Sequence, residues 1–127
     1  MKLQDFPKHI QPYLIPKSEG ALIYRCLGCG NTHGIEKLLY TCPDCGAVLL
    51  LEDPEFDRLK KIPGDTWRRI FDFRRMLNIP ALKGIYRYHE FIVPVLPLDA
   101  LIYLGEGHTP LVEANDRLRE MAGLRFY

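Results

Sequence analysis

Two closely spaced cysteine pairs constrain this chain of 127 residues more than any other feature of its sequence. Two residues separate Cys26 from Cys29 and Cys42 from Cys45, and twelve residues lie between the pairs. A Cys-x2-Cys turn lets both sulfurs reach one ion at about 2.3 Å, and the glycine after each pair frees the backbone to fold around it. The spacing therefore predicts one structural zinc site with the ligands Cys26, Cys29, Cys42 and Cys45.

Other interpretations of the four cysteines are weaker. Two reduced pairs, or a redox pair, would leave so small a unit without a core able to fold it. Catalytic zinc needs an open coordination position, which four thiolates do not leave. His33 lies between the pairs and is a further candidate ligand, but with four cysteines present we expect it on the surface.

Strand-like runs surround the cysteine pairs. Residues 21–24 precede the first pair, residues 37–40 precede the second, and residues 47–51 follow it. Alternation of strands with metal-binding turns is the layout of a zinc ribbon, so we expect a small antiparallel ribbon over residues 21–53.

Charge and hydropathy disfavour two classes of partner. The chain has 17 basic and 16 acidic residues, a net charge of +1, so it has no general attraction for nucleic acid or anionic membranes. Its longest apolar run, residues 47–51, is far shorter than the roughly 20 residues that span a bilayer. The first residues lack an apolar stretch of signal-peptide length. We therefore expect a cytoplasmic chain, in which paired cysteines favour metal over disulfides.

The segments on either side of the ribbon are less regular. Residues 1–20 contain three prolines and predict an irregular lead-in. Residues 54–104 predict a connecting segment that contains a helical turn near its start and a helix at about 67–77, whose N-cap is Asp65 or Thr66. The β-branched and aromatic residues of 85–104, broken by prolines, predict extended segments.

The last part of the chain, residues 105–127, predicts a loop and a short helix. Asn115 can cap a helix at about 116–122, and Gly123 can end it. Residues 124–127 then resemble the start of a strand, which cannot bury a face alone. We expect an α+β fragment, in which residues 105–127 are the truncated start of a larger α/β domain.

Three motifs resemble a known family. Residues 22–30 and 40–46 resemble the N-terminal zinc ribbon of many bacterial and archaeal threonine synthases. Residues 84–88, Gly-Ile-Tyr-Arg-Tyr, are similar to a signature that follows the ribbon there, although Tyr86 stands where tryptophan is usual. Residues 104–112 are similar to the family's Leu-Gly-Glu-Gly-x-Thr-Pro-Leu loop.

The resemblance implies a parent lyase that converts O-phospho-L-homoserine and water to L-threonine and phosphate with pyridoxal phosphate. It also implies that residues 105–127 begin a fold-type-II pyridoxal-phosphate domain, whose remainder is this chain's partner. The family's lysine lies in a Ser-Phe-Lys-Asp motif, which is absent here, as is the cofactor's phosphate-binding loop. No catalytic or cofactor-binding residue is therefore assigned, and we expect this chain alone to be inactive; oligomerisation is left open.

Two other functions remain as alternatives. The first is a paralogous pyridoxal-phosphate enzyme, such as a cysteate synthase. The second is a free-standing zinc ribbon that binds nucleic acid or protein, since arginines and aromatic residues alternate in residues 65–82. An amphipathic helix explains this pattern more simply: its aromatic residues are buried, and its arginines cover them or pair with Asp65 and Asp72.

Several polar residues receive no role from the sequence. Gly105-Glu106-Gly107 predicts a turn rather than a phosphate-binding loop, because its glutamate repels an anion. A solvated stretch is predicted for the acidic residues after the last ribbon strand: Asp53, Glu55 and Asp57. The histidines that receive no role are scattered along the chain: His9, His89 and His108.

Overall fold

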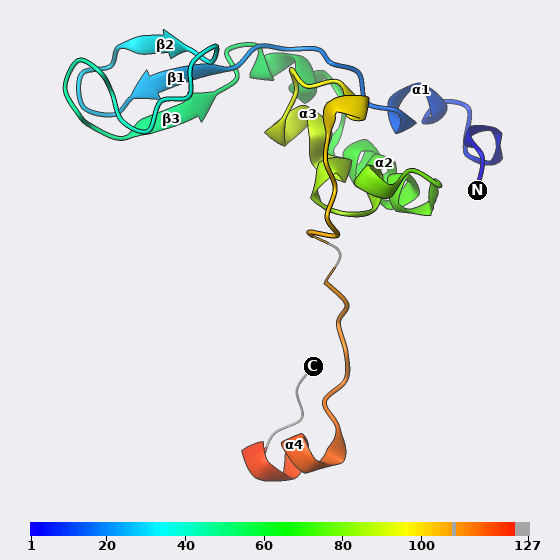
Figure 1. Cartoon of the computed structure of the whole chain (residues 1–127). Helices are drawn as coiled ribbons and strands as arrows, with labels where there is room; N and C mark the ends of the chain where they lie inside the picture. The colour runs from blue at the N-terminus through cyan, green and yellow to red at the C-terminus, as the bar shows by residue number, and fades with distance from the viewer. Residues whose placement is uncertain (108, 124–127) are drawn as a thin grey trace.

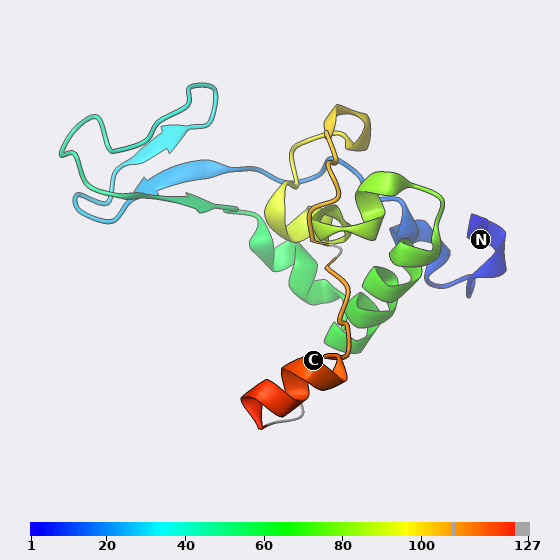
Figure 2. The same ribbon diagram turned by 60° about the horizontal axis from the view of Figure 1, so that its bottom comes forward.

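A computed structural model describes residues 1–107 and 109–123 of the chain. It shows a ribbon at one end, a helical region beside it and a C-terminal helix apart from both (Figure 1). The turned view keeps the ribbon and the helical region separate (Figure 2). His108 and the strand expected at 124–127 lie outside the described residues. None of the helices in the described ranges is long and apolar enough to cross a membrane.

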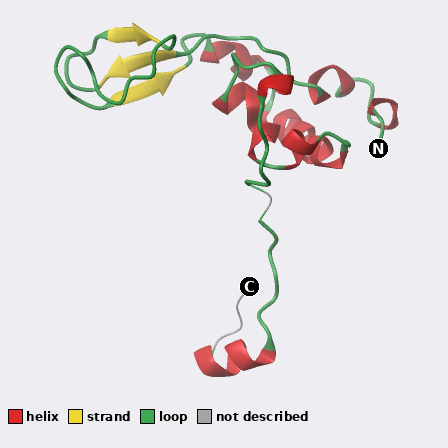
Figure 3. Ribbon diagram, in the orientation of Figure 1, coloured by secondary structure: helices red, strands yellow, loops and turns green. Residues whose placement is uncertain are grey.

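The ribbon is a three-stranded antiparallel sheet in the order β2-β1-β3. Figure 3 shows that these strands are confined to one end of the molecule. The sheet confirms a small α+β structure, and its strands are β1 (Ile23–Cys26), β2 (Thr32–Gly34) and β3 (Leu49–Glu52).

The prediction of a strand at residues 37–40 is wrong. The first cysteine turn reverses the chain at once, so that the residues directly after it pair with β1, with His33 opposite Tyr24. Residues 37–40 then lead to the second turn without strand structure. The apolar side chains in this segment, Leu38 and Tyr40, are 73% and 85% exposed, so their hydrophobicity does not reflect burial in the sheet.

The helical region is built around α2 (Gly64–Met76). This helix confirms the prediction at 67–77 but begins earlier, with Pro63 in place of Asp65 or Thr66 at the N-cap. The carbonyl of Pro63 accepts the N–H groups of Thr66 and Trp67 at 2.9 and 3.1 Å, which closes the first turn without a side-chain cap. Short helical segments surround it: η2 (Phe56–Lys61), η3 (Pro80–Lys83), η4 (Ile85–Tyr88), α3 (His89–Ile92) and η5 (Leu98–Ala100).

The N-terminal twenty residues are not irregular throughout, as the prolines suggested. They contain η1 (Leu3–Asp5) and α1 (Gln11–Leu14), in which Pro12 occupies the first turn, where proline is tolerated. Phe6, Ile10 and Leu14 of this segment are buried. With residues of the helical region they form the core: Phe6, Ile10, Leu14, Leu59, Trp67, Ile70, Leu77 and Leu82.

Residues 85–104 are largely helical turns rather than extended segments. Their aromatic side chains pack on α2: the Phe71 and Tyr88 rings are 4.7 Å apart, and the Trp67 and Phe91 rings 5.0 Å apart. The aromatic composition that predicted extended structure is therefore explained by burial against a helix. Residues 101–104 have no regular secondary structure.

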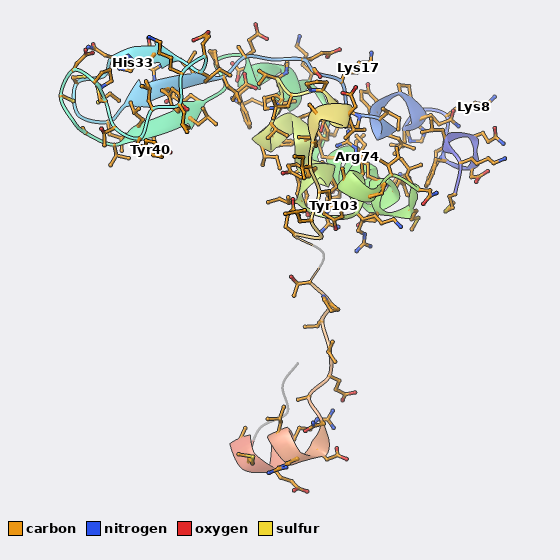
Figure 4. The ribbon with its side chains drawn as sticks, viewed as in Figure 1. Lys8, Lys17, His33, Tyr40, Arg74 and Tyr103 are labelled. Carbon is orange, nitrogen blue, oxygen red and sulfur yellow. The ribbon has the colours of Figure 1, made fainter. Side chains whose placement is uncertain are left out.

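Arg74 is fully buried in the helical region, whereas the sequence suggested a surface arginine (Figure 4). Its guanidinium donates to both carboxylate oxygens of Glu90, at 2.8 and 2.5 Å. It also donates to three backbone carbonyls, those of Tyr13 at 2.7 Å, Leu14 at 3.2 Å and Arg87 at 2.6 Å. Arg74 therefore links the N-terminal segment, α2 and the turns that follow it.

Other charged pairs are partly as expected. Arg68 pairs with Asp65 at 3.2 Å and Arg75 with Asp72 at 3.7 Å, all four exposed on α2. Asp53 differs from the expected solvated stretch, because its side chain is 7% exposed and pairs with Arg58.

The C-terminal helix α4 (Asp116–Ala122) confirms its prediction at both ends. Asn115 Oδ1 accepts the N–H of Leu118 at 3.0 Å, and Gly123 adopts a left-handed conformation with φ of 64°. Figure 1 shows α4 at the end of an extended segment, away from the helical region. Apolar side chains remain exposed along it, including Leu111 at 83% and Met121 at 77%.

Candidate metal centre

The two cysteine turns repeat one backbone pattern. In the first, the Cys26 N–H donates to the Asn31 carbonyl at 2.9 Å, and the Gly30 N–H donates to the Cys26 carbonyl at 3.1 Å. The second turn repeats both bonds at the same offsets from Cys42, at 2.9 and 2.8 Å. Gly30 and Gly46 have φ of 78° and 73°, a left-handed conformation that glycine adopts without strain. The backbones of the two turns therefore match.

The four predicted ligands come together between these turns. The sulfurs of Cys26 and Cys45 are 3.4 Å apart, those of Cys29 and Cys42 are 3.8 Å apart, and all four lie within 4.8 Å of one another. A tetrahedral ion at about 2.3 Å from each sulfur would separate the sulfurs by about 3.8 Å. The four cysteines are therefore a set that can hold a metal ion.

The pKa values of these thiols are also consistent with a cation-binding site. Backbone N–H groups of Cys29 and Gly28 donate to the Cys26 sulfur and lower its pKa to about 6, against the opposing effect of burial. The N–H of Asn31 lowers the pKa of Cys29, but burial and the sulfurs of Cys26 and Cys45 outweigh it and raise that pKa to about 12. Four thiolates this close repel one another, and a bound cation removes that conflict.

The chemistry of the donor set restricts the ion. Four sulfurs without oxygen or nitrogen ligands suit zinc or iron rather than magnesium or calcium. Four protein ligands also fill the tetrahedron, so that no position remains for substrate or water. The arrangement supports folding rather than catalysis at the metal.

His33 lies against this centre, although the sequence suggested a surface position. Its Nε2 is 3.5 Å from the Cys42 sulfur and 3.8 Å from Asp44 Oδ2. The Asn31 side-chain amide donates to the same Asp44 oxygen at 2.7 Å. The strand that positions His33 begins directly after the first turn, and this early reversal of the chain was not predicted from the sequence.

Two motifs that are about twenty residues apart in the sequence pack together. The Ile85 N–H donates to the Glu106 carbonyl at 3.2 Å, and the Glu106 carboxylate accepts the Leu104 N–H at 2.7 Å. A Cβ on Gly84 would collide with the Glu106 carbonyl and the Tyr103 ring. Residues 84–88 and 103–107 thus form one unit, which we call the glycine clasp; Figure 4 shows Tyr103 near the start of the C-terminal segment.

Comparison with known proteins gives one informative match. Over 108 residues, 84% of its length, the chain is 29% identical to the threonine synthase of Methanocaldococcus jannaschii, and it spans 23% of that protein's length. No family model matches the chain, and no solved structure matches it significantly. The match is thus a similarity to about a quarter of one threonine synthase, and it points to the same family as the three sequence motifs.

Proposed function

We propose that this chain is the zinc-binding N-terminal region of a threonine synthase. The observation that carries the proposal is the convergence of four cysteine sulfurs within 4.8 Å. The similarity to the archaeal threonine synthase and the glycine clasp, which joins two of the three motifs, support the family. The zinc ion holds the ribbon in its folded form and takes no part in the reaction.

The full-length parent, a cytosolic lyase, converts O-phospho-L-homoserine and water to L-threonine and phosphate. Pyridoxal phosphate, bound to a lysine of the missing domain, supplies the electron sink for this chemistry. The lysines of the present chain do not fit that role, because six are exposed and Lys83 is only half-buried. A Schiff-base lysine requires a desolvated amine, so we assign this chain a scaffolding part beside the remaining domain.

A nucleic-acid-binding ribbon is less well supported. Three of the four arginines that suggested it have partners within the chain: Arg74 is buried against Glu90, and Arg68 and Arg75 pair with aspartates of the same helix. A paralogue such as a cysteate synthase shares the ribbon and differs in substrate. Formation of threonine by the full-length protein would distinguish a threonine synthase from a cysteate synthase.

The metal proposal is tested by elemental analysis. The purified chain is expected to contain one zinc per polypeptide, with its four thiols protected from a thiol-titrating reagent until a chelator is added. A folded chain without metal and with four freely titrating thiols would contradict the proposal.

Two experiments test the enzyme proposal: sequencing the gene beyond Tyr127, and borohydride trapping of pyridoxal phosphate on the protein. Codons beyond Tyr127 are expected to encode a Ser-Phe-Lys-Asp motif within a few dozen positions. The 127-residue chain should give no covalent adduct when pyridoxal phosphate is reduced with borohydride, and no phosphate from O-phosphohomoserine. Adding the downstream region should restore both. A one-to-one adduct with phosphate release by the short chain would overturn the fragment interpretation.

A further inference from the structure

The two cysteine turns differ at one sulfur despite their matching backbones. The Cys26 sulfur accepts two backbone hydrogen bonds, from Gly28 at 3.3 Å and from Cys29 at 3.4 Å. Its counterpart is the Cys42 sulfur, which accepts no backbone N–H among the residues that the structure describes. Both cysteines are buried, so the Cys42 sulfur lacks donors that water would otherwise supply.

His33 occupies the place of those donors. Its Nε2 lies 3.5 Å from the Cys42 sulfur, within the range of a hydrogen bond to sulfur. The pairing of β2 with β1 fixes its backbone opposite Tyr24, and the side chain is 18% exposed. Asp44 Oδ2 is 3.8 Å from the same nitrogen, lies in the same cluster as the Cys42 sulfur, and is held by the Asn31 amide at 2.7 Å.

We propose that His33 is a positioning residue of the metal centre, which donates its Nε2–H to the Cys42 thiolate where backbone donors are lacking. A hydrogen bond withdraws electron density from a metal-bound sulfur and makes it less reactive towards electrophiles. The nearby Asp44 carboxylate favours the Nε2–H tautomer. His33 therefore slows the loss of zinc from the second turn. This inference rests on the proposed zinc site.

The geometry favours this role over coordination by His33. Four sulfurs already complete the tetrahedron of one ion. A second ion between His33, Cys42 and Asp44 would have to share the Cys42 sulfur and compete with the Asn31 amide for Asp44. A hydrogen bond donated by His33 requires neither a shared Cys42 sulfur nor displacement of the Asn31 amide from Asp44.

The test compares zinc release from three variants of the full chain. His33→Phe keeps a ring without a donor, His33→Gln restores an N–H donor, and His9→Phe is the control, because His9 is exposed and lies outside the ribbon. Zinc-loaded proteins are treated with iodoacetamide, and released zinc is followed with a chromogenic chelator. His33→Phe should release zinc on the order of tenfold faster than wild type, with His33→Gln and His9→Phe close to wild type.

Cobalt substitution supplies a readout that a purely structural role would not change. In His33→Phe the sulfur-to-cobalt charge-transfer band should shift, while the d–d bands keep the pattern of four sulfur ligands. If His33→Phe does not take up one equivalent of metal, His33→Ala replaces it, since it removes the donor without a bulky ring.

Three results would overturn the inference. Unchanged release and spectra in His33→Phe would show that the hydrogen bond has no effect. Altered d–d bands would make His33 a ligand, and a second equivalent of cobalt that is lost in His33→Phe would make it part of a second site. Failure of the wild-type chain to bind any metal would instead refute the proposed function itself.

Discussion

The ribbon and the helical region lie side by side but bury very different side chains. Of residues 21–53, all described, only Cys26 and Cys42 are buried. The helical region with the N-terminal segment buries eight apolar side chains in one cluster, and Arg74 beside them. Apolar burial stabilises in proportion to area, so it can support the second region and not the first. The difference shows that one chain can combine a metal-dependent unit with a conventional hydrophobic core.

Removing one cysteine ligand should produce the largest effect, and this effect should be confined to the ribbon. Cys42→Ser is expected to abolish zinc binding and unfold residues 21–53, because zinc contributes about 10–16 kcal/mol in such small units. Zinc content and backbone NMR spectra measure both effects. The exposed neighbour Thr41 provides the control Thr41→Ser, which should retain one zinc. A folded, metal-free ribbon in Cys42→Ser would show that the ribbon does not depend on metal for its fold.

Truncating the central aromatic residue should damage the helical region alone. Trp67 is 7% exposed, and its indole N–H donates to the Leu59 carbonyl at 3.1 Å. Trp67→Ala is expected to reduce the free energy of unfolding by about 3–5 kcal/mol, in chemical denaturation, without loss of zinc. Loss of zinc in this variant would show that the two regions fold as one unit.

Breaking the buried ion pair tests the polar part of the same core. Arg74→Met leaves the Glu90 carboxylate without its partner and should cost about 3–5 kcal/mol. Arg75→Met removes an exposed pair with Asp72 and should cost about 1 kcal/mol or less. Equal effects in thermal unfolding would contradict the special role of Arg74.

A smaller effect is expected at the glycine clasp. Gly84→Ala places a methyl group against the Glu106 carbonyl and should cost about 1–3 kcal/mol as the loop moves away. Gly64→Ala, where a methyl group meets open space, is the matched control. Proteolysis near residue 105 should increase in the first variant only. Similar sensitivity of both variants would mean that the clasp does not hold the loop.

The smallest effect should come from the exposed arginines of α2. Removing Arg68 and Arg69 together is expected to change stability by less than about 1 kcal/mol, because both side chains face solvent. Tight, salt-sensitive binding of RNA or DNA by the wild type, abolished in this variant, would favour a nucleic-acid-binding module instead.

What the sequence predicted well depended on local chemistry. The cysteine spacing predicted four side chains that the fold brings close together, and the Asn115 cap and Gly123 stop located α4 at both ends. The period of α2 placed Trp67 and Ile70 on its buried face. These features are determined by residues within a few positions of one another.

What the sequence did not predict depended on distant contacts. Arg74 is buried because Glu90 and the carbonyls of the N-terminal segment come to it from other parts of the chain. Residues 85–92 form helical turns because α2 offers their aromatic side chains a surface. His33 reaches Cys42 only through the register of β1 with β2.

Hydrogen exchange before and after zinc removal tests the central difference most directly. The intact chain is stripped with a strong chelator under reducing conditions, and amide exchange is followed by mass spectrometry. Peptides from residues 21–53 should lose their protection, while those from α2 keep it, and added zinc should restore the ribbon. Protection that persists in residues 21–53 without metal would contradict the account.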